Sequence, residues 1–162
     1  GQRFDLMKPG RHVLIQIPKG ERDASTLLRV QADARRLGGC KDMYFQEINV
    51  TGSWAETKHH GGYHYAVSGQ VSADTLEWVA MGKVEIKVVH GRTQSGLDYL
   101  NVYVKHLALA GVAIGGLLGD DDHTDASSLP EGCRHGVALT NGKLALGGHD
   151  HIERSVAESN LE

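Results

Sequence analysis

The chain has 162 residues, of which 40% are hydrophobic and only 3 are proline, so it can bury one core and has the size of one domain. Lysine and arginine number 17 and aspartate and glutamate 20, which leaves a net charge of −3 with histidine neutral. This balance excludes strong electrostatic binding to nucleic acid or to a membrane surface as the expected function. Glycine accounts for 21 of the 162 residues, about twice its usual share of about 7% of a protein. This glycine content favours short strands and many turns.

Strand-like segments follow one another at short intervals along the chain. The first, 12–17, places three aliphatic residues on one face before Pro18 and Gly20 end it. The segments 28–34 and 83–88 alternate apolar and polar residues, the pattern of a sheet with one face in water. Four further segments are rich in aromatic or β-branched residues: 43–50, 63–68, 75–80 and 100–107.

The C-terminal part predicts a hairpin. Asn141-Gly142 separates the apolar segments 137–140 and 143–146, and this dipeptide readily adopts the left-handed φ of a type I′ turn. Eight or nine strands with regular turns predict an all-β domain, either an antiparallel β-sandwich or a barrel-like sheet. We assign this domain to residues 1–148 and expect 149–162 to be a polar tail or linker.

The most acidic segment begins at Gly119, which three aspartates follow directly, with a fourth at Asp125. Adjacent carboxylates repel one another, so the segment must be either well solvated or neutralised by a cation. Calcium is the cation that carboxylates and carbonyl oxygens of a flexible loop bind best. The spacing differs from that of an EF-hand loop, so the residues alone leave a solvated acidic turn and a calcium site as open alternatives.

The ten histidines raise the possibility of a transition-metal site. His59, His60 and His64 fall in one glycine-containing segment, and a metal-dependent enzyme would use these three with His123 or His149 to hold zinc or iron. The simpler interpretation, which we favour, is a polar loop between strands.

Motifs of catalysis are absent from the sequence, which contains no GxSxG, HExxH or GxxxxGK[ST] pattern. We therefore expect no enzymatic activity. The two cysteines, Cys40 and Cys133, lack the spacing of a zinc knuckle and form either one disulfide or two thiols. Asn49 begins the single N-x-[ST] glycosylation pattern of the chain. A glycan and a disulfide both need the secretory route, so these two signals agree on an extracellular or cell-surface location.

Two segments of the chain resemble von Willebrand factor type D domains. Residues 1–16 are similar to the opening strands of that family, which begin with a Phe-Asp-Gly turn, an aromatic residue three positions later, a Pro-Gly turn and a strand. Gly1 matches the glycine of that turn, and Phe4 matches the aromatic residue. The GLLGD sequence at 116–120 is similar to the family's GLCGN segment, with Leu118 in place of its cysteine, and the related C-terminal domain of inter-alpha-trypsin inhibitor heavy chains also carries GLLG. The resemblance implies a calcium-binding loop in which Asp120, Asp122 and Asp125 are ligands. Since this chain has two cysteines and the family has many, disulfide-linked multimers are not implied.

The sequence thus predicts a non-enzymatic structural or adhesive module of a larger surface or matrix protein, whose partners are neighbouring domains or chains. Phe45, Trp54 and Trp78 are the expected large anchors of the core or of an interface. The 12 residues from Leu107 to Leu118 form the most apolar run and are too few to span a membrane, so no membrane insertion is expected. The alternatives are the histidine-dependent metalloenzyme and a filament or coat subunit that assembles through edge strands.

Overall fold

The computed structural model of the chain describes residues 2–20, 23–37, 42–68, 77–122, 124–127, 135–142 and 154–160. The strands in these ranges are β1 (Gln2–Leu6), β2 (Gly10–Ile17), β3 (Leu28–Arg36), β4 (Met43–Thr51), β5 (Tyr63–Ala66), β6 (Val79–Met81), β7 (Val84–Arg92), β8 (Asp98–Lys105), β9 (Val137–Asn141) and β10 (Val156–Ser159). The helical segments are α1 (Ser53–Glu56) and the 3₁₀ turns η1 (Asp23–Ser25) and η2 (Leu107–Ala110).

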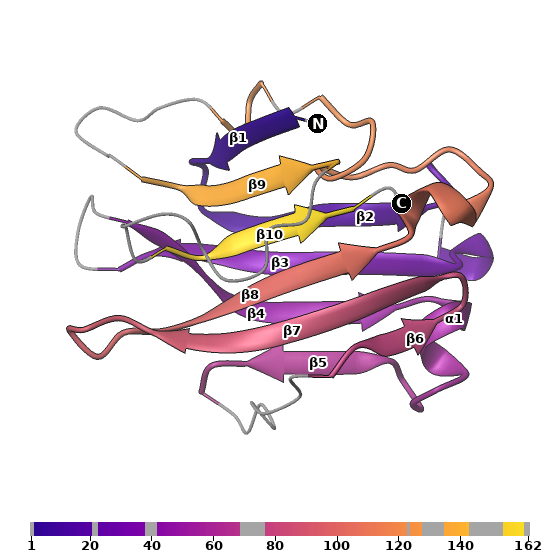
Figure 1. The fold of residues 1–162 in the computed structure, drawn as a ribbon, viewed down its shortest axis with the longest axis horizontal. Coiled ribbons are helices and arrows are strands. Elements are labelled where there is room, and N and C mark those ends of the chain that lie inside the picture. The colour runs from indigo at the N-terminus through magenta and orange to yellow at the C-terminus, as the bar shows by residue number, and fades with distance from the viewer. Residues whose placement is uncertain are drawn as a thin grey trace.

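These strands form one mixed sheet that curls into a half-barrel (Figure 1). Its main path runs β1-β9-β10-β8-β4-β3-β2, with β5 beside β4, and with β7 between β8 and β6. Strand β10 is parallel to both of its neighbours, whereas the other pairs are antiparallel. A single residue pair, Phe45 with Leu100, joins β4 to β8. The sheet therefore has a first arm, β2 to β5, and a second arm, β1 with β6 to β10, that meet at this pair.

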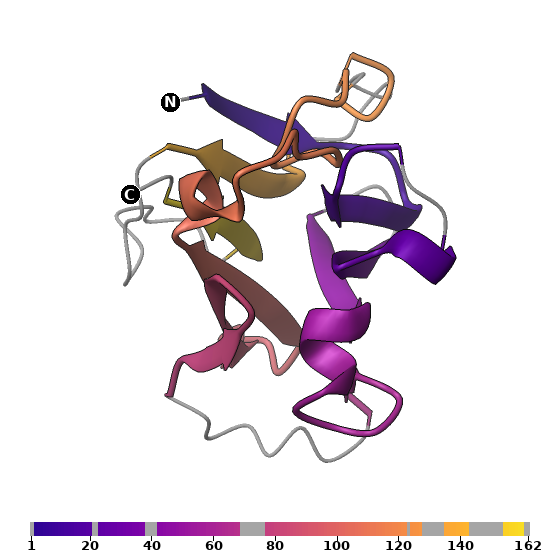
Figure 2. The ribbon, with the colours of Figure 1, turned by 90° about the vertical axis from the view of Figure 1, so that its right-hand side faces the viewer.

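The core fills the space that the curled sheet surrounds. Strands β3 and β7 alternate buried and half-buried residues, as a sheet with one apolar face requires. Phe45 is the largest of the fully buried side chains. The helical segments lie at the end of the molecule that faces the viewer in Figure 2. At this end Trp54 of α1 packs against Gly82, where a Cβ atom would overlap the indole ring.

The edge of β2 that does not pair with β3 is covered by residues 113–122, which we call the strap. The backbone nitrogens of Gln16 and Gly115 each donate to the other's carbonyl oxygen, at 2.9 and 2.8 Å. Leu117 and Leu118 donate to the carbonyls of Val13 and Leu14 at 3.0 and 2.9 Å. The segment that follows, 124–127, accepts hydrogen bonds at the Ala126 carbonyl from the turn between β1 and β2. The strap thus extends the sheet beyond β2 and connects it to the start of the chain.

The predicted all-β class is confirmed, since the protein is mostly β, whereas the strands form one curled sheet and not a demonstrated β-sandwich. The predicted strands at 12–17, 28–34, 43–50, 63–68, 83–88 and 100–107 are found as β2, β3, β4, β5, β7 and β8, with ends that differ by a few residues. Of the predicted strand 75–80, residues 75 and 76 lie outside the described ranges, and β6 begins only at Val79. The sheet is mixed, so the wholly antiparallel arrangement of the prediction does not hold for β10.

The C-terminal predictions differ most from the structure. Residues 156–159, which we expected in a polar tail, form β10 between β9 and β8, and Ala157 is fully buried there. Strand β9 has β1 on one side and β10 on the other, so the predicted hairpin with 143–146 is wrong for the paired residues of β9. Residues 143–146 themselves lie outside the described ranges. A four-residue strand between two neighbours carries too little periodicity to be recognised in the sequence.

Candidate functional site

The aspartates at 120–122 and Asp125 belong to one segment, 120–125, which we call the acidic loop and which begins within the end of the strap. The backbone nitrogen of Asp120 donates to the Ile114 carbonyl at 2.9 Å, and that of Asp121 donates to the Gly116 carbonyl at 3.2 Å. Gly116 has φ of +92°, a left-handed conformation that residues with a Cβ rarely adopt. This tight turn leaves the three consecutive carboxylates, up to Asp122, exposed side by side on the surface.

Two of the predicted calcium ligands have partners within the protein. The Oδ1 atom of Asp122 accepts hydrogen bonds from the backbone nitrogen and the hydroxyl of Thr124, at 3.0 and 2.7 Å. The Nζ atom of Lys8 lies 2.7 Å from Oδ2 of Asp125, although the latter side chain is 83% exposed. An ion pair this exposed contributes little stability. It nevertheless places a protein cation beside the loop, at the position where a metal ion was expected.

The carboxylates are of the type that calcium prefers, but they are spread along the loop. Among the residues that the structure describes, no group of three or more histidine, cysteine, aspartate or glutamate side chains is gathered closely enough to hold a metal ion. A cation would therefore have to draw Asp120, Asp122 and Asp125 together, and their calcium site stays a prediction.

The histidines of the alternative enzyme site are not gathered either. His59 Nδ1 lies 2.8 Å from the Gly62 carbonyl oxygen, and its ring packs against Tyr63 at 5.1 Å. His60 is exposed, and His64 Nε2 is 3.9 Å from Glu47. His123 and His149 lie outside the described ranges.

Within the described ranges, four histidines instead lie beside carboxylates, which the sequence did not indicate. The nitrogen-to-oxygen distances are 3.9 Å for His64–Glu47, 3.0 Å for His90–Asp98, 3.1 Å for His106–Glu85 and 2.8 Å for His135–Asp42. The partners are between 8 and 93 positions apart in the sequence. The pairs form between neighbouring strands or just beyond strand ends, so no local motif could reveal them.

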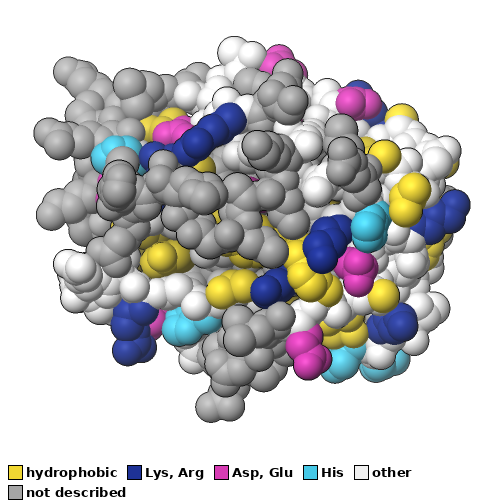
Figure 3. All heavy atoms as spheres, in the orientation of Figure 1, with side chains coloured by type: hydrophobic (Ala, Val, Ile, Leu, Met, Phe, Trp, Pro, Cys, Tyr) yellow, Lys and Arg dark blue, Asp and Glu magenta, His cyan; other side chains and the backbone are white. Residues whose placement is uncertain are grey.

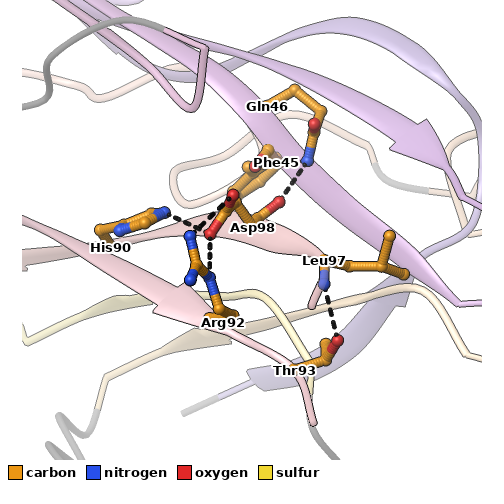
Figure 4. A network of polar contacts seen from close by, with 7 residues as sticks. All are labelled: Phe45, Gln46, His90, Arg92, Thr93, Leu97 and Asp98. Atoms are coloured by element: carbon orange, nitrogen blue, oxygen red, sulfur yellow. Dashed lines mark hydrogen bonds and ion pairs between the residues drawn. The ribbon is translucent and has the colours of Figure 1, made fainter. Parts of the chain in front are cut away.

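The most connected of these pairs is centred on Asp98, at the start of β8 (Figure 4). Arg92 donates to both carboxylate oxygens, from Nε at 2.8 Å and from Nη2 at 3.4 Å. Gln46 of β4 donates to the Asp98 backbone carbonyl at 3.0 Å. The hydrogen bond from Arg92 lowers the pKa of Asp98 below its usual value near 3.8, and the charges of Arg92 and His90 act in the same direction. The network ties the β7–β8 turn to the first arm.

This lowered pKa gives a testable pH dependence. The unfolded chain protonates Asp98 at a higher pH than the folded chain does, so the carboxylate stabilises the fold above about pH 4 and this contribution is lost as the pH falls through the folded-state pKa. We expect Asp98→Asn to make stability less dependent on pH between 5 and 2, measured as the urea midpoint at several pH values. Arg92→Gln should have the same effect, because Arg92 is the main cause of the shift. An unchanged acid profile in both variants would contradict this assignment.

A groove crosses the outer face of the first arm on both sides of Arg29 and Gln31 in β3. One hollow, of about 330 Å³, opens toward α1 and is also lined by Thr26, Thr51, Gly52 and Glu56. The other, of about 310 Å³, opens toward the strap and is also lined by Val13, Gln16, Lys19, Gly20, Gly115 and Asp121. Arg29 Nε donates to Gln16 Oε1 at 2.6 Å, and Nη2 donates to the Thr26 hydroxyl at 3.3 Å. The groove was not predicted, because its residues come from four separate stretches of the chain: 13–20, 26–31, 51–56 and 115–121.

Of the predicted glycosylation and disulfide residues, only the asparagine lies in a described part of the chain. Asn49 lies in β4 on the outer face, half-buried, opposite Gln31 on one side and His64 on the other. Cys40 and Cys133 both lie outside the described residues. Residues two positions after each of them are in contact, since Asp42 Oδ1 lies 2.8 Å from His135 Nδ1.

The three aromatic residues expected to anchor the core or an interface differ in their burial and contacts. Phe45 is buried in the core, and Trp54 is partly buried against it. Trp78 instead lies under two lysines, with Lys105 Nζ 4.0 Å and Lys87 Nζ 5.8 Å from the centre of its ring. On the face shown in Figure 3, basic, acidic and histidine side chains are interspersed with hydrophobic ones, in agreement with the balanced charge of the sequence.

Comparisons bring no further assignment to these sites. The helices of the described ranges include none with the length and apolar character that a membrane span requires. Comparison of the chain with models of protein families, with curated proteins and with solved structures found no match. The resemblance to von Willebrand factor type D domains therefore remains a prediction from residues 1–16 and 116–120.

Proposed function

We propose that the chain is a non-enzymatic structural or adhesive module of an extracellular assembly, similar to a von Willebrand factor type D domain. Neighbouring domains or chains are its partners. The observation that carries the proposal is the position of the acidic loop, whose first residues, Asp120 and Asp121, bond back to Ile114 and Gly116 of the strap that covers the edge of β2. A cation bound to this loop would hold the strap against β2. It would also fix the surface that the loop presents to a neighbouring domain or chain.

The electrostatics of the loop support a role for calcium. Three consecutive exposed carboxylates repel one another, and a divalent ion that they share removes this repulsion. Calcium accepts six to eight oxygen ligands in flexible geometry, so carbonyl oxygens and water can complete a site that has few carboxylates. Lys8 provides a weaker neutralising charge at Asp125. In this proposal the two arms of the sheet act as the layers of a β-sandwich, joined at Phe45 and Leu100.

The same proposal includes a secretory route, with a disulfide between Cys40 and Cys133 and a glycan on Asn49. The contact between Asp42 and His135 permits the disulfide, because each cysteine is only two residues, or at most about 7 Å of chain, from one member of this pair. The exposed side of β4 supports the glycan, because Asn49 points away from the core.

Calcium dependence of thermal stability tests the proposal. We expect calcium at about a hundred times its Kd to stabilise the protein by about 2.7 kcal/mol relative to a chelator, a rise in Tm of about 5–10 °C. The double variant Asp120→Asn with Asp122→Asn should lose this response while keeping the fold. Asp33→Asn, which removes a carboxylate of β3 that is not part of the acidic loop, should keep it. A Tm that is the same with calcium and with chelator in all three proteins would refute the cation role, and stoichiometric zinc or iron in the purified protein would favour the histidine-dependent enzyme.

A further inference from the structure

Three polar side chains stand together on the outer face of the first arm. Asn49 of β4 is directly opposite Gln31 of β3, and Thr51 is two residues further along β4 on the same face. All three are half-buried, yet their side chains make no hydrogen bond within the part of the chain that the structure describes. Two other asparagines do bind the protein, since Asn101 accepts from the Val156 backbone and Asn141 donates to the Leu118 carbonyl. The cluster around Asn49 is therefore suited to bind something outside the protein chain.

A hollow of suitable size adjoins this cluster. The 330 Å³ hollow is lined by Gln31 and Thr51 together with Thr26, Arg29 and Glu56. Its volume is at the lower end of the range of about 300–1,000 Å³ for small-molecule sites. Amide, hydroxyl, guanidinium and carboxylate groups are the donors and acceptors that bind the hydroxyls of a sugar. Asn49 itself does not line the hollow, but two of its neighbours on the outer face, Gln31 and Thr51, do.

The glycosylation pattern coincides with this hollow. Along a strand, residues two apart are separated by about 7 Å, so a sugar attached to Asn49 reaches Thr51 at the edge of the hollow. Val50, between them, is fully buried, which directs both neighbours outward. We infer that Asn49 carries an N-linked oligosaccharide whose first sugar, an N-acetylhexosamine, is seated in the hollow beside Thr51 and forms part of the outer face.

This inference rests on the secretory route of the proposed function. The oligosaccharide comes from a lipid-linked diphosphate donor. The Asn49 amide nitrogen forms a bond to C1 of the sugar, the bond between C1 and the diphosphate oxygen breaks, and the lipid diphosphate leaves with the electron pair. The amide gives up one proton in the same step.

Enzymatic trimming of the secreted protein tests whether the first sugar is seated. The protein is expressed in a eukaryotic secretory host, and mass spectrometry of its peptides identifies a modified Asn49. One glycosidase then cuts the glycan after the first sugar, and an amidase removes it completely. We expect the protein with one sugar to keep the Tm of the full glycoprotein, and the protein without sugar to melt about 3 °C lower.

Variants of the glycosylation pattern and of the hollow provide controls. Thr51→Ser keeps the pattern and should keep the glycan, whereas Thr51→Val should abolish it. Gln31→Ala and Glu56→Ala leave the pattern intact and should remove the difference in Tm between one sugar and none. The amidase converts Asn49 to aspartate when it removes the glycan. The Asn49→Asp variant should therefore have the same Tm as the amidase-treated protein.

Two results would overturn the inference. The first is a secreted protein with unmodified Asn49. The second is a glycan whose complete removal leaves the Tm unchanged, which would mean that the sugar does not contact the hollow. Neither result involves the acidic loop. The calcium response of the unglycosylated protein tests the proposed function separately, so the two failures are distinguishable.

Discussion

Gly116→Ala is expected to lower the free energy of unfolding by about 2–5 kcal/mol, which corresponds to a Tm loss of roughly 4–20 °C. Gly116 has φ of +92°, and a left-handed backbone costs a residue with a Cβ about 1–2 kcal/mol. A Cβ there would also overlap the Leu14 carbonyl oxygen and lie 2.6 Å from the Ile15 nitrogen. These are backbone atoms of β2, so relief would require separating the strap from the strand, and such overpacking adds about 1–3 kcal/mol.

The chain contains a closely matched control for this substitution. Gly96 has φ of +90°, but a Cβ at that position would meet nothing within 4 Å. Gly96→Ala should therefore show only the backbone cost of about 1–2 kcal/mol. Urea unfolding of both variants measures the difference. Equal losses would mean that the strap does not pack closely on β2, and the proposed role of the acidic loop in closing the sheet would lose its basis.

Phe45→Ala is expected to cost about 3–5 kcal/mol, the range for removing a large aromatic side chain from a packed core. Phe45 is fully buried and forms the residue pair with Leu100 that joins the two arms of the sheet. The substitution should therefore weaken both arms together. We expect amide protons of β4 and β8 to exchange faster with solvent by a similar factor.

The second phenylalanine of the chain, Phe4, is the control for this experiment. It lies in β1 and is only partly buried against the core. Phe4→Ala should cost less, about 1–2 kcal/mol, because less apolar surface is lost from the interior. Exchange that accelerates in only one arm of the Phe45→Ala protein would show that the two arms fold independently, contrary to the single-core description.

The acidic loop illustrates how far a functional site could be predicted. The run of aspartates after Gly119 and its exposure follow from the sequence, because adjacent charges cannot be buried without a partner. The ion pair of Asp125 with Lys8 could not be predicted, since the two residues are 117 positions apart and meet only because the loop returns to the β1–β2 turn. The histidine–carboxylate pairs and the groove around Arg29 could not be predicted either, because their residues also meet only in the folded chain.

The sequence by itself determined which residues face the core. Alternation in 28–34 and 83–88 predicted the inward faces of β3 and β7, because side chains of a strand point alternately to opposite sides. Tertiary structure alone decided the order of the strands and the insertion of β10 parallel to β9 and β8. Local periodicity reports the environment of a strand but not the identity of its neighbours, and pairing between strands far apart in the chain depends on how the whole core packs.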